Sequence, residues 1–437
     1  MRVYKPSGIK WLGEIPKHWE VRKLGDICEI VMGEFLDFSP TAQNDNKASL
    51  ICHSELSQES EESKKLPILD VKYLRNNGER KLASRGNLAN INDRLILMDG
   101  ENSGEIFITK EKGFLGSTLK KLKFSNLNQI EFVDFVLLCY KDFFKNNKKG
   151  TAIPHLDKHL FANHKIPLPP LQEQKEIAEF LDKKCEKIQN YINKKQKLIT
   201  LLQEKKQALI NEAVTKGLNP NIESKNSGIE YLGLIPHHWE VVKVKYIATT
   251  NIGLVYDPSE IATNENVGYP VLRANNIQNG KIDYKDVIYV AKKIDDKQLA
   301  ISGDLLMCVR NGSENLLGKT AKIENNNFSF GAFTAIIRSD LNNYLYWIFQ
   351  TEMLKKSISS FIVSIGIGQI SQDDIKNFKI PLPPLQEQKE IAEFLDKKCE
   401  KINSAIEKTK RQIELIKEYK NTLINEAVCG RINLERK

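Results

Sequence analysis

A long stretch after Pro170 has apolar residues at alternating intervals of three and four. Proline at 167, 169 and 170 excludes a helix before Leu171, and nothing breaks a helix from there to Gly217. This spacing is typical of a coiled-coil seam. All of its positions except two lysines are apolar: Ala178, Leu181, Cys185, Ile188, Ile192, Lys195, Ile199, Leu202, Lys206, Leu209 and Ala213.

A second stretch near the end of the chain has the same pattern, at Ala392, Leu395, Cys399, Ile402, Ile406, Thr409, Ile413, Ile416, Lys420, Leu423 and Ala427. Either helix alone would expose an apolar stripe to water. We therefore expect the two helices to bury their stripes against each other, as an intramolecular antiparallel coiled coil. At about 1.5 Å per residue such a rod is roughly 65 Å long, comparable to about 19 base pairs of DNA.

The segments between these stretches have short runs of β-forming residues with turn residues between them. The runs that we expect to be strands are Arg94–Met98, Glu105–Thr109, Asp304–Val309 and Ala332–Ile337. One helix is expected near the end of each segment, at Phe132–Phe144 and Asn342–Leu354. These patterns predict two mixed α/β modules.

The chain contains an internal repeat, which is the sequence signature of a repeated architecture. Ser7–Glu20 returns with few changes as Ser227–Glu240, and Lys165–Ile188 recurs without one change as Lys379–Ile402. The segments between these copies share little sequence. We therefore expect a constant frame around two variable heads, with a pseudo-twofold repeat and with boundaries at 1–20, 21–164, 165–222, 223–240, 241–378 and 379–437.

Composition limits the class of protein. The 437 residues are 41% hydrophobic and 28% charged, as in globular proteins, and no apolar run is long enough to span a membrane. The polar start does not fit a signal peptide, so we expect the cytoplasm. The formal charge of +9 suits a polyanionic partner without requiring one. Seven cysteines without a Cys-x-x-Cys pair argue against disulfides and a cysteine-rich zinc site.

Several short patterns suggest chemistry that their context does not support. Gly312 to Thr320 has five residues between its glycines where a phosphate-binding loop has four. His155 and His159 have the spacing of some zinc ligands, but the repeat aligns them with Gln369 and Asp373. The tryptophans of the constant frame, Trp11, Trp19 and Trp239, could stack on bases, and with Tyr231 are better explained as structural anchors. We expect no catalytic residue, metal or cofactor.

The chain resembles the specificity (S) subunits of type I restriction-modification systems over essentially its whole length. Three features carry the resemblance: the Gly-Ile-Lys-Trp-Leu-Gly-Glu-Ile-Pro-Lys-His-Trp-Glu opening, the Ile-Pro-Leu-Pro-Pro-Leu-Gln-Glu-Gln-Lys-Glu-Ile-Ala run, and the repetition of both around dissimilar inserts. The resemblance implies that each insert is a target recognition domain for one half of a split DNA sequence. It also implies that the repeated helices set the spacer and dock two methyltransferase (M) subunits, which restriction (R) subunits then join.

Base reading would use loop residues with donors and acceptors that match base edges. The alternative for each candidate is a solvated loop, since phosphate-facing and merely exposed polar residues look alike in sequence. The candidates in the first insert are Arg75, Asn76, Asn77, Arg80, Lys81, Arg85, Lys148, Lys149 and Thr151. Those in the second insert are Arg273, Asn275, Asn276, Arg310, Asn311, Ser313, Ser364, Gln369 and Ser371.

The sequence is also compatible with two other functions. An elongated scaffold with protein-binding heads would have the same composition, and an enzyme with an unrecognised site has little residue support. Divergent heads on a near-identical frame favour one partner set with two distinct targets. Because the heads differ, the expected DNA target is not palindromic.

Overall fold

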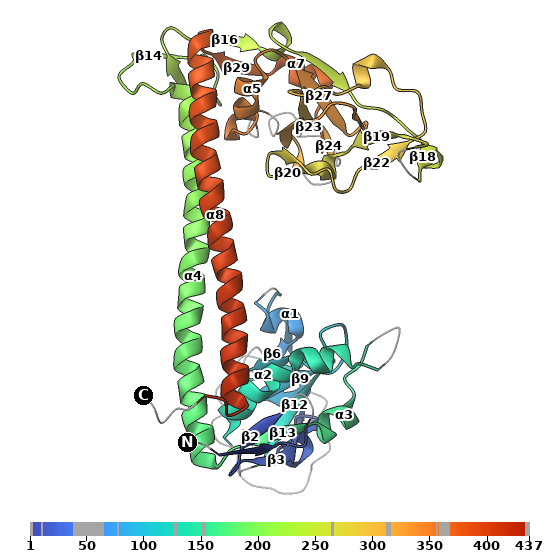
Figure 1. Ribbon diagram of the computed structural model, residues 1–437, viewed down its shortest axis with the longest axis vertical. Helices are drawn as coiled ribbons and strands as arrows, with labels where there is room; N and C mark the ends of the chain where they lie inside the picture. The colour runs from blue at the N-terminus through green and yellow to red at the C-terminus, as the bar shows by residue number, and fades with distance from the viewer. Residues whose placement is uncertain are drawn as a thin grey trace, which may run out of the picture. The chain divides into compact units, whose positions relative to one another are not determined.

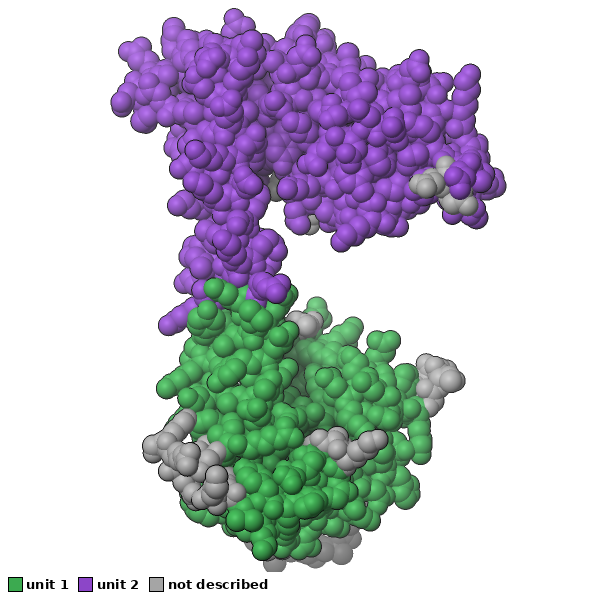
Figure 2. Space-filling view, in the orientation of Figure 1, with its two compact units in different colours: residues 1–193, 412–437 green, residues 194–411 purple. Residues whose placement is uncertain are grey.

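A computed structural model (Figure 1) describes residues 3–9, 12–37, 65–76, 78–125, 129–149, 154–263, 266–311, 316–354, 357 and 368–432. The chain divides into two compact units, which Figure 2 colours separately. Unit 1 comprises residues 1–193 and 412–437, and unit 2 comprises residues 194–411. Each unit therefore combines one α/β head with a part of both long helices.

The two long helices are α4 (Leu171–Lys216) and α8 (Leu385–Val428). Each starts directly after a Pro-Pro pair, and a buried glutamine closes its first turn. The Nε2 atom of Gln174 donates to Pro169 O at 2.8 Å, and Gln388 donates to Pro383 O at 2.7 Å. Gly217, with φ +76°, ends α4 in the left-handed conformation that favours glycine.

Within each unit the two helices lie side by side and antiparallel (Figure 1). In unit 2, Lys206 Nζ of α4 donates to Asn403 Oδ1 of α8 at 3.0 Å. In unit 1, burial raises the pKa of the Cys185 thiol on α4, and the positive charge of Lys420 on α8 opposes that rise. This confirms the antiparallel coiled coil expected from the repeat. The seam residues that are buried or half-buried in it are Leu181, Cys185, Ile188, Ile192, Ile199, Leu202, Leu209, Leu395, Cys399, Ile402, Ile406, Ile413, Ile416 and Leu423.

The head of unit 1 packs two sheets against each other. The first has the order β10-β9-β12-β4 and the second the order β5-β8-β11-β6-β7. Leu69 and Ala89 of the second sheet share a buried core with Leu95, Leu97 and Leu119 of the first. The strands are β4 (Cys28–Val31), β5 (Phe35–Asp37), β6 (Leu66–Leu69), β7 (Leu82–Ala83), β8 (Arg85–Ala89), β9 (Arg94–Leu97), β10 (Ile106–Ile108), β11 (Gly113–Leu115) and β12 (Leu119–Phe124).

Three α-helices complete this head in the described part of the chain: α1 (Val71–Leu74), α2 (Ile130–Asn146) and α3 (Lys158–Asn163). The longest, α2, extends the expected helix Phe132–Phe144 by about a residue or two at each end. A salt bridge of 2.7 Å between Arg94 Nη2 and Asp134 Oδ2 joins α2 to strand β9.

The head of unit 2 repeats this plan with a wider sheet, of order β17-β27-β23-β25-β21-β20, and a second sheet, of order β18-β22-β19-β26. Its central strand is apolar at every position because both of its faces are buried. Leu305 and Met307 pack toward α5 (Asn342–Ile348) and the long helices, and Leu306 and Cys308 pack toward the opposite core. The expected strand Asp304–Val309 is confirmed, as are those at Arg94–Met98, Glu105–Thr109 and Ala332–Ile337, each within two residues.

The strands of this head are β17 (Thr249–Ile252), β18 (Ile261–Ala262), β19 (Tyr269–Leu272), β20 (Ile277–Gln278), β21 (Lys281–Ile282), β22 (Ile288–Val290), β23 (Leu305–Cys308), β24 (Arg310–Asn311), β25 (Thr320–Lys322), β26 (Ser329–Phe330), β27 (Thr334–Arg338) and β28 (Gly368–Gln369). Its named helices are α5 (Asn342–Ile348) and α7 (Gln372–Asn377). The expected helix Asn342–Leu354 is thus broken by a turn after Ile348. Strand β25, not a helix, follows Gly318 and Lys319, which does not fit a phosphate-binding loop.

The constant frame forms the same small structure in both units. Strands β1 (Tyr4–Pro6) and β2 (Glu14–Pro16) pair, as do β14 (Ser224–Asn226) and β15 (Leu234–Pro236). The strand after each tryptophan, β3 (Glu20–Lys23) or β16 (Glu240–Lys243), pairs with the strand before a long helix, β13 (Lys165–Leu168) or β29 (Lys379–Leu382). Trp19 and Trp239 are fully buried, so they are structural anchors as predicted.

Candidate nucleic-acid interface

The second head contains a groove of about 490 Å³ between two walls that come from distant parts of the sequence. Arg273 and Asn275, in the loop after β19, form one wall. Phe333, before β27, lies on the other, and 56% of its side chain is exposed. An exposed aromatic ring beside amide and guanidinium groups offers both a stacking surface and hydrogen-bond donors.

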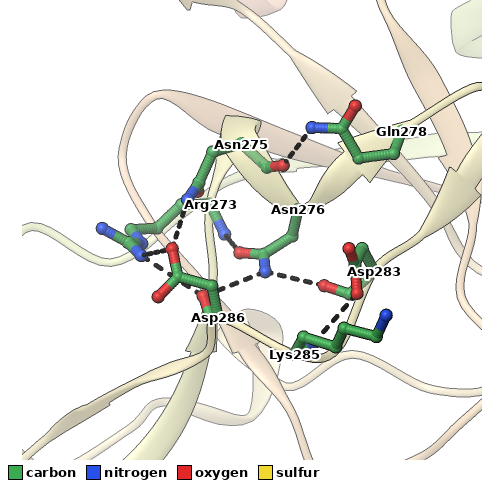
Figure 3. A network of polar contacts seen from close by, with 7 residues as sticks. All are labelled: Arg273, Asn275, Asn276, Gln278, Asp283, Lys285 and Asp286. Carbon is green, nitrogen blue, oxygen red and sulfur yellow. Dashed lines mark hydrogen bonds and ion pairs between the residues drawn. The ribbon is translucent and has the colours of Figure 1, made fainter. Parts of the chain in front are cut away.

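A network of hydrogen bonds holds the Arg273 loop (Figure 3). Asp286 Oδ2 accepts from Arg273 Nη2 at 3.2 Å and from Asn275 Nδ2 at 2.9 Å. Asn276 accepts from the backbone of Arg273 and donates to the carbonyls of Asp283 and Asp286 at 2.8 and 3.1 Å. Asn276 is 1% exposed and its amide is used inside the loop, so we correct its role: it shapes the loop and does not reach a base.

Arg310 and Gln369 lie far apart in the sequence but are neighbours in space. They lie opposite each other in the antiparallel pair β24-β28. Both side chains are exposed, and the Arg310 guanidinium lies 5.2 Å from the centroid of the Phe333 ring. A guanidinium over an aromatic face is held in one orientation while its outer N–H groups stay available. The structure thus brings two candidates together and adds Phe333 to them.

Ser371 has a structural role that the sequence reading did not assign. Its hydroxyl accepts from the Asp374 backbone at 3.0 Å and donates to Asp374 Oδ2 at 2.6 Å, which caps the start of α7. Asp157 caps α3 in the first head at the position that the repeat aligns with Ser371. The structure thus gives Ser371 the role of a helix cap, and its contact with a base stays a prediction.

Four of the six cationic candidates of the first head are paired with acidic groups or carbonyls of the same head. Arg75 forms an ion pair with Glu105, and Arg80 Nη2 lies 2.8 Å from Glu111 Oε2. Hydrogen bonds from Tyr73 and Arg80 lower the pKa of the Glu111 carboxyl below its ordinary value. Exposed pairs of this kind contribute little to stability.

The remaining candidates of the first head lie on three separate elements. Asn76 ends the turn after α1 with φ +57°, while Lys81 and Arg85 are exposed beside β7 and β8. Lys148 Nζ donates to Glu101 O at 2.8 Å, and Lys149 Nζ lies 2.7 Å from Asp157 Oδ2. Outside the described residues lie Asn77, Thr151, Ser313, Ser364, Trp11 and the side chain of Asn311.

A second hollow of unit 2, of about 570 Å³, contains lysines that the sequence reading missed. It lies between the long helices and the head and is lined by Lys206, Lys281, Lys319 and Lys410, with Glu407 as its one acidic residue. No short pattern could have found this cluster, because its members come from α4, β21, the loop before β25 and α8. Such a concentration of positive charge suits a phosphate backbone.

The described residues offer no obvious chemistry of their own. Among them, no group of three or more His, Cys, Asp or Glu side chains could hold a metal ion. The six cysteines in the described ranges are free, and burial raises the pKa of Cys28 and Cys139 to about 12, which keeps these thiols protonated. No helix in the described part of the chain is both long and apolar enough to cross a membrane.

Comparison with known proteins agrees with this arrangement of one frame and two heads. The family model for the type I restriction modification DNA specificity domain matches twice, at residues 16–202 and 236–415. The MjaVIII specificity subunit of Methanocaldococcus jannaschii is 31% identical over the whole of this chain and 98% of its own length. The EcoKI specificity subunit of Escherichia coli K12 is 29% identical over 46% of this chain and 44% of its own length.

A solved structure has the same fold. A chain from a study of complex assembly and conformational transition of the type I R-M system superimposes with a TM-score of 0.70 and 16% identity, over 96% of this chain and 99% of its own. The double match of the family model and the full-length relative give one conclusion: the chain belongs to the family of type I restriction enzyme specificity subunits, with two copies of the DNA specificity domain.

Proposed function

We propose that this chain binds DNA in a sequence-specific manner and that each head reads one half of a bipartite, asymmetric target. One observation carries this proposal. The same frame, with the same Trp and Glu contacts, presents two heads whose exposed polar side chains differ. A shared frame with different reading surfaces gives two different half-sites, so the full target is not a palindrome.

The surface around Phe333 would read the bases of the second half-site. Arg310 presents a fork of N–H donors, which matches O6 and N7 of guanine in the major groove. Gln369 and Asn275 carry the donor and acceptor pair that matches N6 and N7 of adenine. The lysines of the second hollow, Lys281 among them, would contact phosphates and position the head without reading sequence.

The identical parts of the frame would bind identical partners. Leu171 and Leu385 occupy aligned positions at the starts of α4 and α8 and are 55% and 56% exposed. Leu201 and Leu415 are also aligned and are 51% and 53% exposed. Leucines exposed at the same points of both repeats offer two equivalent apolar docking points, which suits two methyltransferase subunits.

The long helices would set the spacer between the two half-sites. Their seam is continuous along α4 and α8, so each added turn would lengthen the rod by about 5.4 Å. Lengthening the helices should therefore widen the spacer and leave the bases read unchanged. Methylation and cleavage would be carried out by the M and R subunits, because the chain itself serves as the specificity subunit.

The rival scaffold function predicts heads that are indifferent to DNA sequence. Arg310→Lys and Arg310→Ala separate the two functions in a complex reconstituted with the methyltransferase. The lysine variant keeps the charge and loses the fork geometry. If Arg310 reads guanine, both variants relax one base position of the second half-site by about 1–3 kcal/mol. Unchanged base preference in both variants, with Lys376→Ala as the surface control, would support the scaffold.

A further inference from the structure

Each head has a pair of polar side chains on facing backbone segments at its surface. In the second head the pair is Arg310 and Gln369, across strands β24 and β28. In the first head Asp99 lies opposite His155 in an antiparallel bridge. The repeat aligns His155 with Gln369, and each lies two residues before the residue that caps the following helix, Asp157 or Ser371.

Backbone hydrogen bonds show that the two pairs occupy the same place in the fold. Leu156 N donates to Met98 O at 2.8 Å, and Ile370 N donates to Val309 O at 2.8 Å. Met98 and Val309 each directly follow a buried central strand, β9 or β23. Asp99 therefore stands where the second head has Arg310.

The same register places Thr118 where the second head has Phe333. Met98 N donates to Thr118 O at 2.8 Å, and Val309 N donates to Phe333 O at 2.9 Å. The first head thus lacks the aromatic ring under its pair and has an acidic group in place of the guanidinium. The two heads present opposite hydrogen-bonding chemistry at one equivalent position.

The geometry of the first pair fixes what it can offer a ligand. His155 Nδ1 lies 2.6 Å from Asp99 Oδ1, and the side chains are 54% and 34% exposed. A carboxylate can only accept, so Nδ1 is the donor, and Nε2 of the neutral ring is then an acceptor. Together with the second carboxylate oxygen, the pair presents acceptors, whereas Arg310 presents donors.

We infer that Asp99 and His155 form a base-reading pair of the first head and select a base with an exocyclic amino group in the major groove. Adenine N6 and cytosine N4 are the two such groups, and both are donors there. This inference rests on the proposed DNA-reading function and adds to it the residues and the chemical class of base. A hydrogen bond between exposed side chains contributes little to folding, so stability does not explain the pair.

The test exchanges the chemistry between heads in the complex reconstituted with the methyltransferase. The double variant Asp99→Arg with His155→Gln gives the first head the Arg–Gln pair of the second head. The single variants Asp99→Asn and His155→Ala each remove one member of the Asp99–His155 pair. The matched control is His159→Gln, an exposed histidine on α3 in the same segment. The readout is the base preference at every position of both half-sites, from single-base methylation mapping.

We expect each Asp99 or His155 variant to lose roughly ten-fold or more of the preference for adenine or cytosine at one position of the first half-site. The exchanged pair should shift that position toward guanine, and the second half-site should stay unchanged. The thermal midpoints of the variants should match that of His159→Gln. A bipartite motif with unaltered preference, or a uniform loss over all sequences, would overturn the inference alone. Absence of any motif in the wild-type complex would instead remove the proposed function.

Discussion

The indole nitrogen of Trp239 donates a hydrogen bond of 3.0 Å to Oε2 of Glu387, and His238 Nε2 lies 2.6 Å from the other carboxylate oxygen. Trp19 makes the same bond, also of 3.0 Å, to Glu173. One glutamate at the start of each long helix thus joins that helix to the Pro-x-His-Trp-Glu segment of the frame. This explains why both halves of the repeat carry these residues together.

Removing that carboxylate should destabilise unit 2. Glu387→Ala leaves the N–H of a fully buried tryptophan without its acceptor, and a hydrogen bond to a charged group contributes about 1.5–3 kcal/mol. We expect the free energy of unfolding, measured by urea titration, to fall by about that amount. Glu390→Ala, on the exposed face of the same helix, is the control and should change it by less than about 0.5 kcal/mol. Equal effects of the two variants would refute this role.

His164 should make the stability of unit 1 depend on pH. It packs against the rings of Tyr140, Phe143 and Phe144, and burial lowers its pKa below the ordinary value. The unfolded chain then takes up the proton at a higher pH than the folded chain. Stability is therefore lost as the pH falls below the ordinary histidine pKa of about 6.5 toward the lower folded pKa.

Phe378 holds the aligned position in the second head, so His164→Phe is a natural replacement. We expect this variant to unfold at nearly the same urea concentration from pH 7 to pH 5, while the wild type weakens over that range. His159→Gln should keep the wild-type dependence. If the free energy of unfolding of His164→Phe still falls with pH as in the wild type, other groups cause the pH dependence.

Lys281 should contribute to DNA affinity without contributing to specificity. It is exposed beside the lysine-rich hollow of unit 2. Lys281→Ala should reduce the slope of log affinity against log salt by about one and weaken cognate and non-cognate DNA alike. Fluorescence anisotropy of the reconstituted complex at several salt concentrations measures both effects. An altered motif, or a slope equal to that of Lys376→Ala, would contradict a phosphate contact.

Leu201 and Leu415 should each support one methyltransferase subunit. An aspartate on such an apolar docking point carries a charge into the interface, where burial is costly. We expect Leu201→Asp and Leu415→Asp each to bind one copy and the double variant to bind none, as measured by native mass spectrometry. Leu218→Asp, beyond the end of α4, is the exposed control. Two copies bound to both single variants would place docking elsewhere.

The sequence was sufficient to predict the frame because its signals are local and repeated. The three-four spacing of apolar residues and the proline and glycine boundaries determine α4 and α8. The copied His-Trp-Glu segment predicted structural tryptophans. The same chain carries the apolar seam twice, so each long helix has an obvious partner in the other. The coiled coil could therefore be predicted without knowing any contact between distant residues.

The candidate interface was less predictable because capping, loop-building and base-reading use the same residue types. Asn276 and Ser371 have polar groups suited to DNA, yet their hydrogen bonds lie within the protein. Phe333 could not be distinguished from the apolar run of β27. The equivalence of Asp99 and Arg310 depends on strand register, which dissimilar sequences conceal and backbone hydrogen bonds reveal. The domain boundaries, such as 21–164 and 241–378, stay predictions.

If the two heads read separate half-sites, exchanging one head should change only the half-site that this head reads. Residues 21–164 would be replaced by the corresponding head of a relative with a different target, in complex with the methyltransferase, followed by single-base methylation mapping of genomic DNA. We expect a split motif in which the first half changes and the second half and the spacer stay constant. A first half-site that stays unchanged after the exchange, or the absence of any motif in the wild type, would show that the heads do not read separate half-sites.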